Sequence, residues 1–196
     1  AAGIFGYMGY DTVRLIEHLP ATRPDELDLP DSILVRPTLI VIFDTVKDEM
    51  TVVTPVRPAP GVSAKAAYSR AADRLNVVIE RLDQPLPHVS DLEAEGAHPE
   101  PKPSVAPAVY MEKVARAKEY IAAGDIFQVV LSQRFEAPFT LPSFSLYRAL
   151  RRTNPSPFLF HLDFGAFALV GSSPEILVRV RDGEVTIRPL AGTRRR

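Results

Sequence analysis

The sequence predicts an α+β protein, and three observations lead to this prediction. Apolar residues recur at three- and four-residue spacing within 63–82, 110–121 and 143–152, which is typical of amphipathic helices. Short β-rich runs, bounded by glycine, proline or charged turns, lie before and after these segments. Helices and strands do not alternate strictly, as a parallel α/β sheet would require, so the pattern favours α+β.

The composition is that of an ordinary globular chain and excludes several classes of protein. Of the 196 residues, 46% are hydrophobic and 24% are charged. A net charge of -1 argues against binding to nucleic acid or to anionic membranes, because both need a surplus of basic residues. The absence of cysteine excludes disulfides and thiolate metal sites. With no signal-peptide pattern in 1–11 and no membrane-spanning apolar run, we expect a cytoplasmic protein.

The first region, 1–83, is expected to contain strands followed by one helix. Its opening run, Ile4–Asp11, places Gly6 and Gly9 among bulky apolar residues, which predicts a strand that other backbone approaches closely. The further expected elements are a short helix at 12–19, a loop at 20–31, a hairpin from 38–46 and 50–56, and a helix at 63–82.

A proline-rich stretch at 84–107 is expected to be an exposed linker. Proline makes up 19 of the 196 residues, about double the average frequency, and large apolar residues are almost absent from this stretch. Such a segment cannot bury enough surface to order itself. The linker would separate the first region from a second one, 108–196.

The second region is expected to contain two helices and a series of short strands. The first helix carries Tyr110 and Ile121 on one face and ends at Gly124. The elements that follow are a β run at 126–135, a helix at 143–152, and an antiparallel meander of strands at 158–164, 166–170, 176–180 and 185–187.

Residue spacing alone does not define a catalytic site. The chain has no nucleophile elbow, phosphate-binding loop or zinc-ligand spacing, and its four histidines are not spaced as metal ligands. His161 alternates with apolar residues in an expected strand, which favours a structural role. On these grounds the chain is a globular α+β domain and no more.

Four short motifs in a fixed order carry more information. They are Ile121–Val130, Asn154–Phe158, Gly171–Glu175 and Arg188–Arg194. Together they resemble the chorismate-utilising enzymes and, within them, the anthranilate synthase component I family; Gly6–Asp11 is similar to a sheet motif of that family. The resemblance covers nearly the whole chain except the linker. It implies part of a two-sheet antiparallel β-sandwich with outer helices.

The resemblance also implies an activity. Members of the family form anthranilate and pyruvate from chorismate and ammonia in tryptophan biosynthesis, and tryptophan inhibits them. Ammonia comes from a glutamine amidotransferase partner, component II, and Mg²⁺ holds the substrate carboxylate. The metal-binding glutamates of the family would follow Arg196. We therefore expect the chain to be an internal, truncated fragment with its Mg²⁺ ligands downstream, and to be inactive by itself.

Several residues acquire expected roles from this resemblance. Glu175 follows Pro174, which restrains the backbone, and could protonate the departing hydroxyl if burial raised its pKa; the alternative is a surface glutamate at a strand start. Gly192 and Thr193 could offer backbone N–H groups and a hydroxyl to the substrate; the alternative is a plain loop.

Two positions bear on the choice of nucleophile. By resemblance, aminodeoxychorismate synthase has a lysine where this chain has Ala191, and that amine attacks the ring carbon C2. Isochorismate and salicylate synthases resemble this pattern too, with a lysine where this chain has Gln128, and that lysine activates water. The absence of both lysines favours external ammonia and therefore anthranilate.

One segment matches the region that lines the tryptophan site in the family. Its prolines restrain the backbone, and an aromatic ring can stack on an indole; the alternative is a rigid turn leading into a core strand. The residues expected to bind the effector are Asn154, Pro155, Ser156, Pro157, Phe158 and Leu159.

Two other functions stay open at this point. The chain could belong to another chorismate-aminating synthase, of the aminodeoxychorismate or the phenazine pathway. It could also be a non-catalytic fragment that only binds an effector or the amidotransferase. A glutamate-bearing helix and a glycine-rich loop after Arg196 would favour an enzyme.

Overall fold

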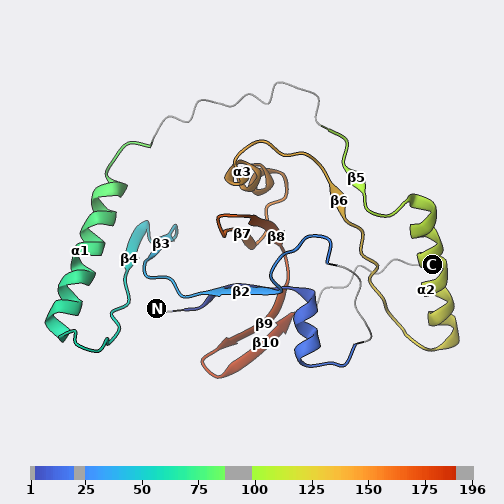
Figure 1. Ribbon diagram of the computed structural model, residues 1–196, viewed down its shortest axis with the longest axis horizontal. Coiled ribbons are helices and arrows are strands. Elements are labelled where there is room, and N and C mark those ends of the chain that lie inside the picture. The colour runs from blue at the N-terminus through green and yellow to red at the C-terminus, as the bar shows by residue number, and fades with distance from the viewer. Residues whose placement is uncertain (1–2, 20–24, 87–98, 189–196) are drawn as a thin grey trace. The chain divides into compact units, whose positions relative to one another are not determined.

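The computed structural model describes residues 3–19, 25–86 and 99–188 and divides into two compact units, Ala1–His88 and Val89–Arg196. Each unit combines helices with antiparallel strands, which confirms the α+β class (Figure 1). The described strands pair as five two-stranded sheets. These strands pair only in twos and leave many large apolar side chains exposed, Leu177 and Phe43 among them, so the expected two-sheet sandwich is not confirmed by the described residues.

Unit 1 begins with a strand pair that a glycine makes possible. Strand β1 (Phe5–Met8) pairs antiparallel with β2 (Ser32–Val35), and Gly6 lies opposite Leu34. A Cβ on Gly6 would lie 1.8 Å from the Ile33 carbonyl oxygen, and the φ of Gly6 is 153°. The predicted close approach of backbone to this strand is confirmed. The partner strand β2 was not expected.

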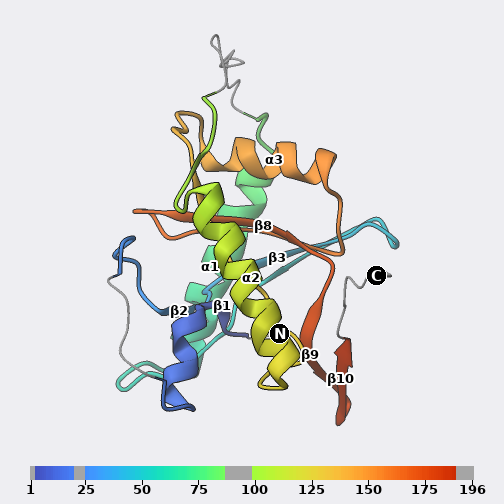
Figure 2. The ribbon, with the colours of Figure 1, turned by 90° about the vertical axis from the view of Figure 1, so that its right-hand side faces the viewer.

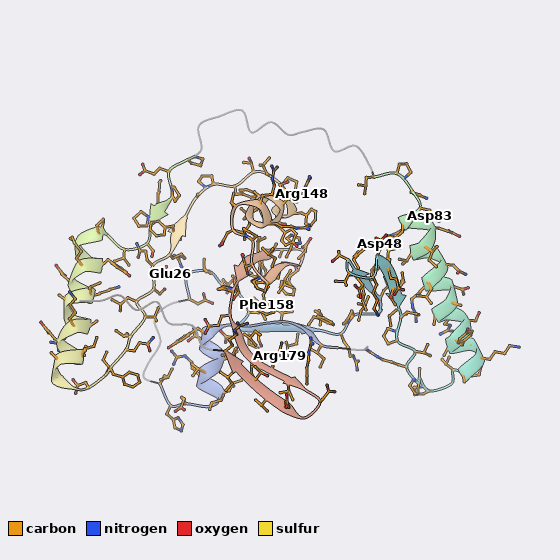
Figure 3. All side chains as sticks on the ribbon, turned by 180° about the vertical axis from the view of Figure 1, so that it is seen from behind. Glu26, Asp48, Asp83, Arg148, Phe158 and Arg179 are labelled. Carbon is orange, nitrogen blue, oxygen red and sulfur yellow. The ribbon has the colours of Figure 1, made fainter. Side chains whose placement is uncertain are left out.

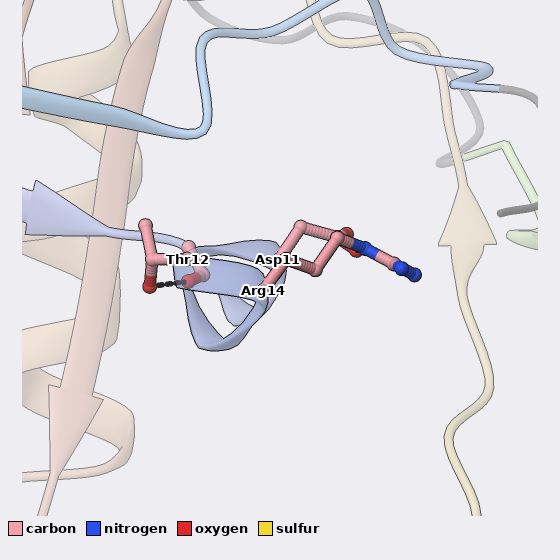
Figure 4. Close-up of polar contacts among 4 residues, drawn as sticks. Asp11, Thr12 and Arg14 are labelled. Carbon is pink, nitrogen blue, oxygen red and sulfur yellow. Dashed lines mark hydrogen bonds and ion pairs between the residues drawn. The ribbon is translucent and has the colours of Figure 1, made fainter. Parts of the chain in front are cut away.

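A 3₁₀ helix, η1 (Tyr10–Leu15), replaces the helix expected at 12–19. The backbone N–H and the hydroxyl of Thr12 both donate to the Gly9 carbonyl, at 3.2 and 2.6 Å. These three-residue steps produce the tighter 3₁₀ winding. Figure 4 shows the Thr12 contact and the Arg14–Asp11 ion pair of 2.8 Å on the same turn.

The hairpin and the long helix expected in unit 1 are confirmed. Strands β3 (Ile40–Asp44) and β4 (Glu49–Val53) pair in register, and the Asp44 carboxylate accepts hydrogen bonds from the turn amides of Val46 and Lys47. Helix α1 (Ala64–Leu82) begins after Ser63, whose hydroxyl accepts a hydrogen bond from the Ala66 amide at 3.2 Å. This is the N-cap that serine commonly provides.

Unit 2 opens with a short strand pair and a helix. Helix α2 (Pro107–Ala123) ends at Gly124, whose φ of 84° is left-handed, as expected of a glycine stop. Strand β5 (Lys102–Pro103) pairs with β6 (Phe135–Glu136), so part of the expected 84–107 linker is a strand. The β run expected at 126–135 is wrong except at Phe135, because no strand within residues 3–19, 25–86 and 99–188 pairs with residues 126–134.

The rest of unit 2 is a helix on one hairpin, followed by a second hairpin. Helix α3 (Ser143–Thr153) contacts strands β7 (Phe158–Asp163) and β8 (Ala168–Ser173), and both views show the helix to one side of β8 (Figures 1 and 2). Strands β9 (Ile176–Arg181) and β10 (Glu184–Arg188) form the other hairpin. The structure therefore has two hairpins where one continuous meander was expected, since β8 and β9 do not pair.

Side-chain contacts fix α3 on its hairpin. The Ser143 hydroxyl lies 2.9 Å from Nε2 of His161, and the Phe144 ring meets the His161 ring edge-on at 5.5 Å. The Phe160 ring covers Gly171 so closely that a Cβ there would lie 2.1 Å from it. His161 is thus a satisfied strand residue, as its alternation with apolar neighbours indicated.

Candidate functional site

Glu175 lies in the short connection between β8 and β9. Its backbone N–H donates to the Ser173 hydroxyl at 3.2 Å, and that hydroxyl lies 3.4 Å from the Glu175 carbonyl oxygen. These contacts fix the backbone where Pro174 already restrains it. The Glu175 side chain is exposed, so the described residues do not supply the burial that its expected general-acid role requires.

The segment Asn154–Leu159 connects α3 to β7. Asn154 ends the helix, and its backbone N–H donates to the Leu150 carbonyl at 2.8 Å. The Ser156 hydroxyl accepts a hydrogen bond from the Phe158 amide at 3.3 Å. Both prolines of the segment are exposed, and Phe158 stands at the start of β7 (Figure 3). The turn is therefore closed by its own serine and presents its prolines to solvent.

Hydrogen bonds join this segment to the end of β8. The Ser172 hydroxyl donates to the Asn154 carbonyl at 2.7 Å, and the Ser156 hydroxyl donates to the Ser173 carbonyl. The strand register agrees, since Phe158 lies opposite Ser173 and Leu159 opposite Ser172. The β7–β8 hairpin thus brings the segment expected to bind tryptophan next to the motif that contains Glu175.

Ser173 is the residue that the sequence did not single out. Its carbonyl accepts from Ser156, and its hydroxyl accepts from the Glu175 amide. One residue therefore contacts both the expected effector segment and the expected catalytic glutamate. The sequence did contain a signal for this contact. The expected strands at 158–164 and 166–170 are neighbours in the chain, and pairing them as a hairpin predicts that the start of the first meets the end of the second.

Three further expected residues, Ala191, Gly192 and Thr193, lie outside the described residues. Gln128 lies on the irregular chain that follows α2 and is exposed. Position 128 thus carries a neutral amide that solvent can reach. Of the expected site residues, the structure brings together the Asn154–Leu159 segment and Glu175.

No group of three or more histidine, aspartate or glutamate side chains is placed to hold a metal ion within residues 3–19, 25–86 and 99–188. Side-chain hydrogen bonds to Glu119 and Tyr120 raise the pKa of Arg116, but this guanidinium lies on the exposed face of α2. None of the described helices is both long and apolar enough to cross a bilayer.

The whole chain, residues 1–196, matches the family of chorismate binding enzymes, and the protein belongs to that family. Anthranilate synthase component 1 of Cereibacter sphaeroides is 53% identical over 100% of this chain, and that of Thermus thermophilus is 42% identical over 99% of it. The crystal structure of anthranilate synthase component I from Streptococcus pneumoniae TIGR4 superposes on 95% of the chain with a TM-score of 0.83 at 35% identity.

The chain spans only part of each of these relatives. It covers 39% and 40% of the two sequences and 41% of the Streptococcus chain. The expected resemblance to anthranilate synthase component I is confirmed. Because about three fifths of each relative lies outside the aligned segment, the activity of the whole protein is a matter for proposal.

Proposed function

We propose that this chain is part of an anthranilate synthase component 1, a lyase that converts chorismate and ammonia to anthranilate and pyruvate in tryptophan biosynthesis. The observation that carries the proposal is the match along the entire chain to proteins of that name, at 53% identity for the Cereibacter sphaeroides sequence. We propose that the enzyme is cytoplasmic. None of the described helices is long and apolar enough to cross a membrane.

The proposed chemistry assigns roles to four residues. Ammonia forms a bond to C2 of chorismate while the bond from C4 to its hydroxyl breaks, and Glu175 supplies the proton that leaves with this hydroxyl as water. The added ammonium group gives up a proton. The proton on C2 then leaves as the bond from C3 to the enolpyruvyl oxygen breaks, so that the ring becomes aromatic and the released enolpyruvate takes up a proton to give pyruvate. Gly192 and Thr193 hold the substrate through backbone N–H groups and a hydroxyl. The methyl side chain of Ala191 leaves C2 open to ammonia.

The backbone contacts of Glu175 support this assignment. A general acid must stay at a fixed distance from the atom that it protonates. Pro174 restrains the approach to Glu175, and the Ser173 hydroxyl accepts the Glu175 N–H. We propose that the bound substrate and the rest of the protein exclude water from the carboxyl group, which the described residues leave exposed.

Tryptophan is the proposed feedback inhibitor, bound at Asn154–Leu159. An indole can stack on Phe158 and contact the exposed proline rings beside it. The bonds from Ser156 to Ser173 and from Glu175 to Ser173 support a direct influence of this segment on the glutamate. Tryptophan would shift the balance between two positions of this turn and so displace Glu175.

Two further components belong to the proposal. A glutamine amidotransferase, component II, would supply ammonia, in agreement with the name component 1 that the relatives carry. Mg²⁺ would supply charge that stabilises the substrate carboxylate when bound. The family resemblance implies that its ligands lie in sequence that follows Arg196.

The test uses the full-length protein with chorismate, ammonia and Mg²⁺, and follows anthranilate by fluorescence. Glu175→Gln removes the transferable proton and keeps the size of the side chain, so kcat should fall by roughly 10²–10⁴ with little change in KM. Glu184→Gln, on an exposed position of β10, is the control and should retain full activity. A near-normal kcat in the Glu175 variant would assign that residue a structural role.

The main alternative is an aminodeoxychorismate or phenazine-pathway synthase, and it differs from anthranilate synthase in the product that it forms. Mass spectrometry of the full-length reaction distinguishes anthranilate, with pyruvate, from an aminated ring that keeps its enolpyruvyl group. Ala191→Lys should suppress anthranilate formation, because the lysine amine would occupy the path of ammonia to C2. The 196-residue chain alone should give no product, because it spans only 39% and 40% of the length of the two relatives. If it still binds tryptophan, it acts as a binding module.

A further inference from the structure

A cavity of about 240 Å³ is formed by residues of unit 1 alone, whereas the segments assigned to chorismate and tryptophan belong to unit 2. It is formed by the chain around the end of β4, by the turn that follows and by the first half of α1. The residues that line it include both basic and apolar side chains. Its basic members are Arg57, Arg70 and Arg74, and its apolar members include Val56, Val62 and Ala67.

The helix presents its part of the lining as one face. Ala67, Arg70 and Arg74 stand three and four positions apart along α1, a spacing that places side chains one above another. Nε of Arg74 donates to the Thr54 hydroxyl at 3.0 Å, and this hydroxyl donates to the Thr38 carbonyl at 2.8 Å. These two bonds fix the Arg74 guanidinium at the cavity wall through Nε, and they do not use its two terminal amino groups.

The charge of the cavity contrasts with that of its surroundings. Acidic side chains outnumber basic ones among the described residues of unit 1, yet the lining contains three arginines and no aspartate or glutamate. Within that described part, none of the three arginines forms an ion pair. Asp73 is next to Arg74 in the sequence but does not line the cavity. Gathered cations repel one another, and a bound anion removes this repulsion.

We propose that this cavity binds a small organic anion, a phosphate or carboxylate attached to a compact apolar group. The guanidinium forks of Arg57, Arg70 and Arg74 match the paired oxygens of either head group. The apolar wall formed by Val56, Val62 and Ala67 shields a few carbon atoms from water. The cavity volume lies just below the usual range for ligand pockets, so the ligand is small. This site does not depend on the proposed anthranilate synthase activity.

The test measures binding to the full-length protein by titration calorimetry at constant ionic strength, without chorismate. The probes are phenyl phosphate, benzoate and inorganic phosphate. We expect saturable binding of phenyl phosphate or benzoate, whichever carries the preferred head group, and weaker binding of inorganic phosphate. Arg57→Gln and Arg70→Gln should each weaken the organic probe about tenfold, since each removes charged hydrogen bonds.

Arg81→Gln is the matched control, because Arg81 lies in the last turn of the same helix and does not line the cavity. Its affinity for each probe should equal that of the unaltered protein. The proposal is overturned if no probe binds saturably, if the control loses as much affinity as the cavity variants, or if inorganic phosphate binds as tightly as the organic probes. Circular dichroism of each variant identifies a folding defect, and in that case Arg70→Lys, which keeps the charge but loses the fork, provides the comparison.

Discussion

The β1–β2 and β7–β8 pairs are both antiparallel and two-stranded, but they are held together in different ways. In β1–β2, Gly6 meets the backbone of Ile33, so the two main chains touch with no side chain between them. In β7–β8, Gly171 meets the ring of Phe160, and α3 covers the strands through Ser143 and Phe144.

This difference separates a rigid contact from an adaptable one. Two backbones in contact have no freedom to adjust, whereas a ring and a set of serine hydroxyls can move by small amounts. The adaptable pair is the one that carries the Asn154–Leu159 and Glu175 segments. An effector can regulate a site only through an element that has two arrangements of similar energy, and an adaptable strand pair can provide one.

The largest effect is expected from Gly6→Ala. Its Cβ would collide with the Ile33 carbonyl, and the φ of 153° adds backbone strain, so unfolding of β1–β2 should become easier by about 3–5 kcal/mol. Hydrogen exchange of the β1 amides in the full-length protein measures this. Gly61→Ala, which has a φ of 72° but open space around it, should cost only about 1–2 kcal/mol. Equal costs would mean that the backbone contact is unimportant.

A smaller effect is expected from Gly171→Ala in the other pair. The new Cβ meets a ring that is 40% exposed and can turn away, so the cost should be about 2 kcal/mol. Phe160→Leu in the same chain should recover part of this loss, because the shorter side chain makes room. A double-mutant cycle on urea unfolding measures the coupling, and strict additivity would contradict the packing described here.

Pro157→Ser probes the proposed effector segment. It frees φ and removes an apolar contact, so tryptophan should inhibit the full-length variant about tenfold less well, a loss of about 1–2 kcal/mol. Activity without tryptophan should persist, because the residues assigned to catalysis lie elsewhere. Pro58→Ser, an exposed proline of unit 1, is the control. If inhibition is unchanged while the melting temperature and activity fall together, the segment is a structural turn.

The smallest effect is expected from Ser156→Ala. It removes the bond to the Ser173 carbonyl and the bond from the Phe158 amide, which together should cost about 1 kcal/mol of stability. In the full-length enzyme we also expect weaker tryptophan inhibition with kcat unchanged in the absence of tryptophan. Ser69→Ala, on the exposed face of α1, controls for loss of a hydroxyl. Full tryptophan sensitivity in the Ser156 variant would show that the hydroxyl does not link the two segments.

Local patterns predicted most of the elements, because their causes are local. The apolar spacing of α1 and α3, the glycine stop at Gly124 and the turn between β3 and β4 all depend on residues within a few positions of one another. Gly6 could be linked to close backbone approach for the same reason, since its lack of a side chain is visible in the sequence.

Pairing over long distances limited the rest of the prediction. The β-rich residues of 126–135 resemble a strand, but a strand exists only where a partner lies beside it, and β5 pairs with Phe135 and Glu136 alone. For the site, the motif order indicated Glu175 and the Asn154–Leu159 segment. The bond between Ser156 and Ser173, which are 17 positions apart, depends on the hairpin geometry and could not be read from either motif.

The two strand pairs also differ in the length of the loop that each has to close. In β7–β8 the innermost pair is Asp163 with Ala168, so the hairpin closes over a very short loop, on a timescale of about 1–10 μs. In β1–β2, Phe5 must find Val35, and the chain must first lose the entropy of a much longer loop. During synthesis β1 waits until β2 emerges, whereas β7 pairs almost as soon as β8 emerges. Once the backbone contact at Gly6 has formed, the paired edge of β1 is no longer open to pairing with other chains.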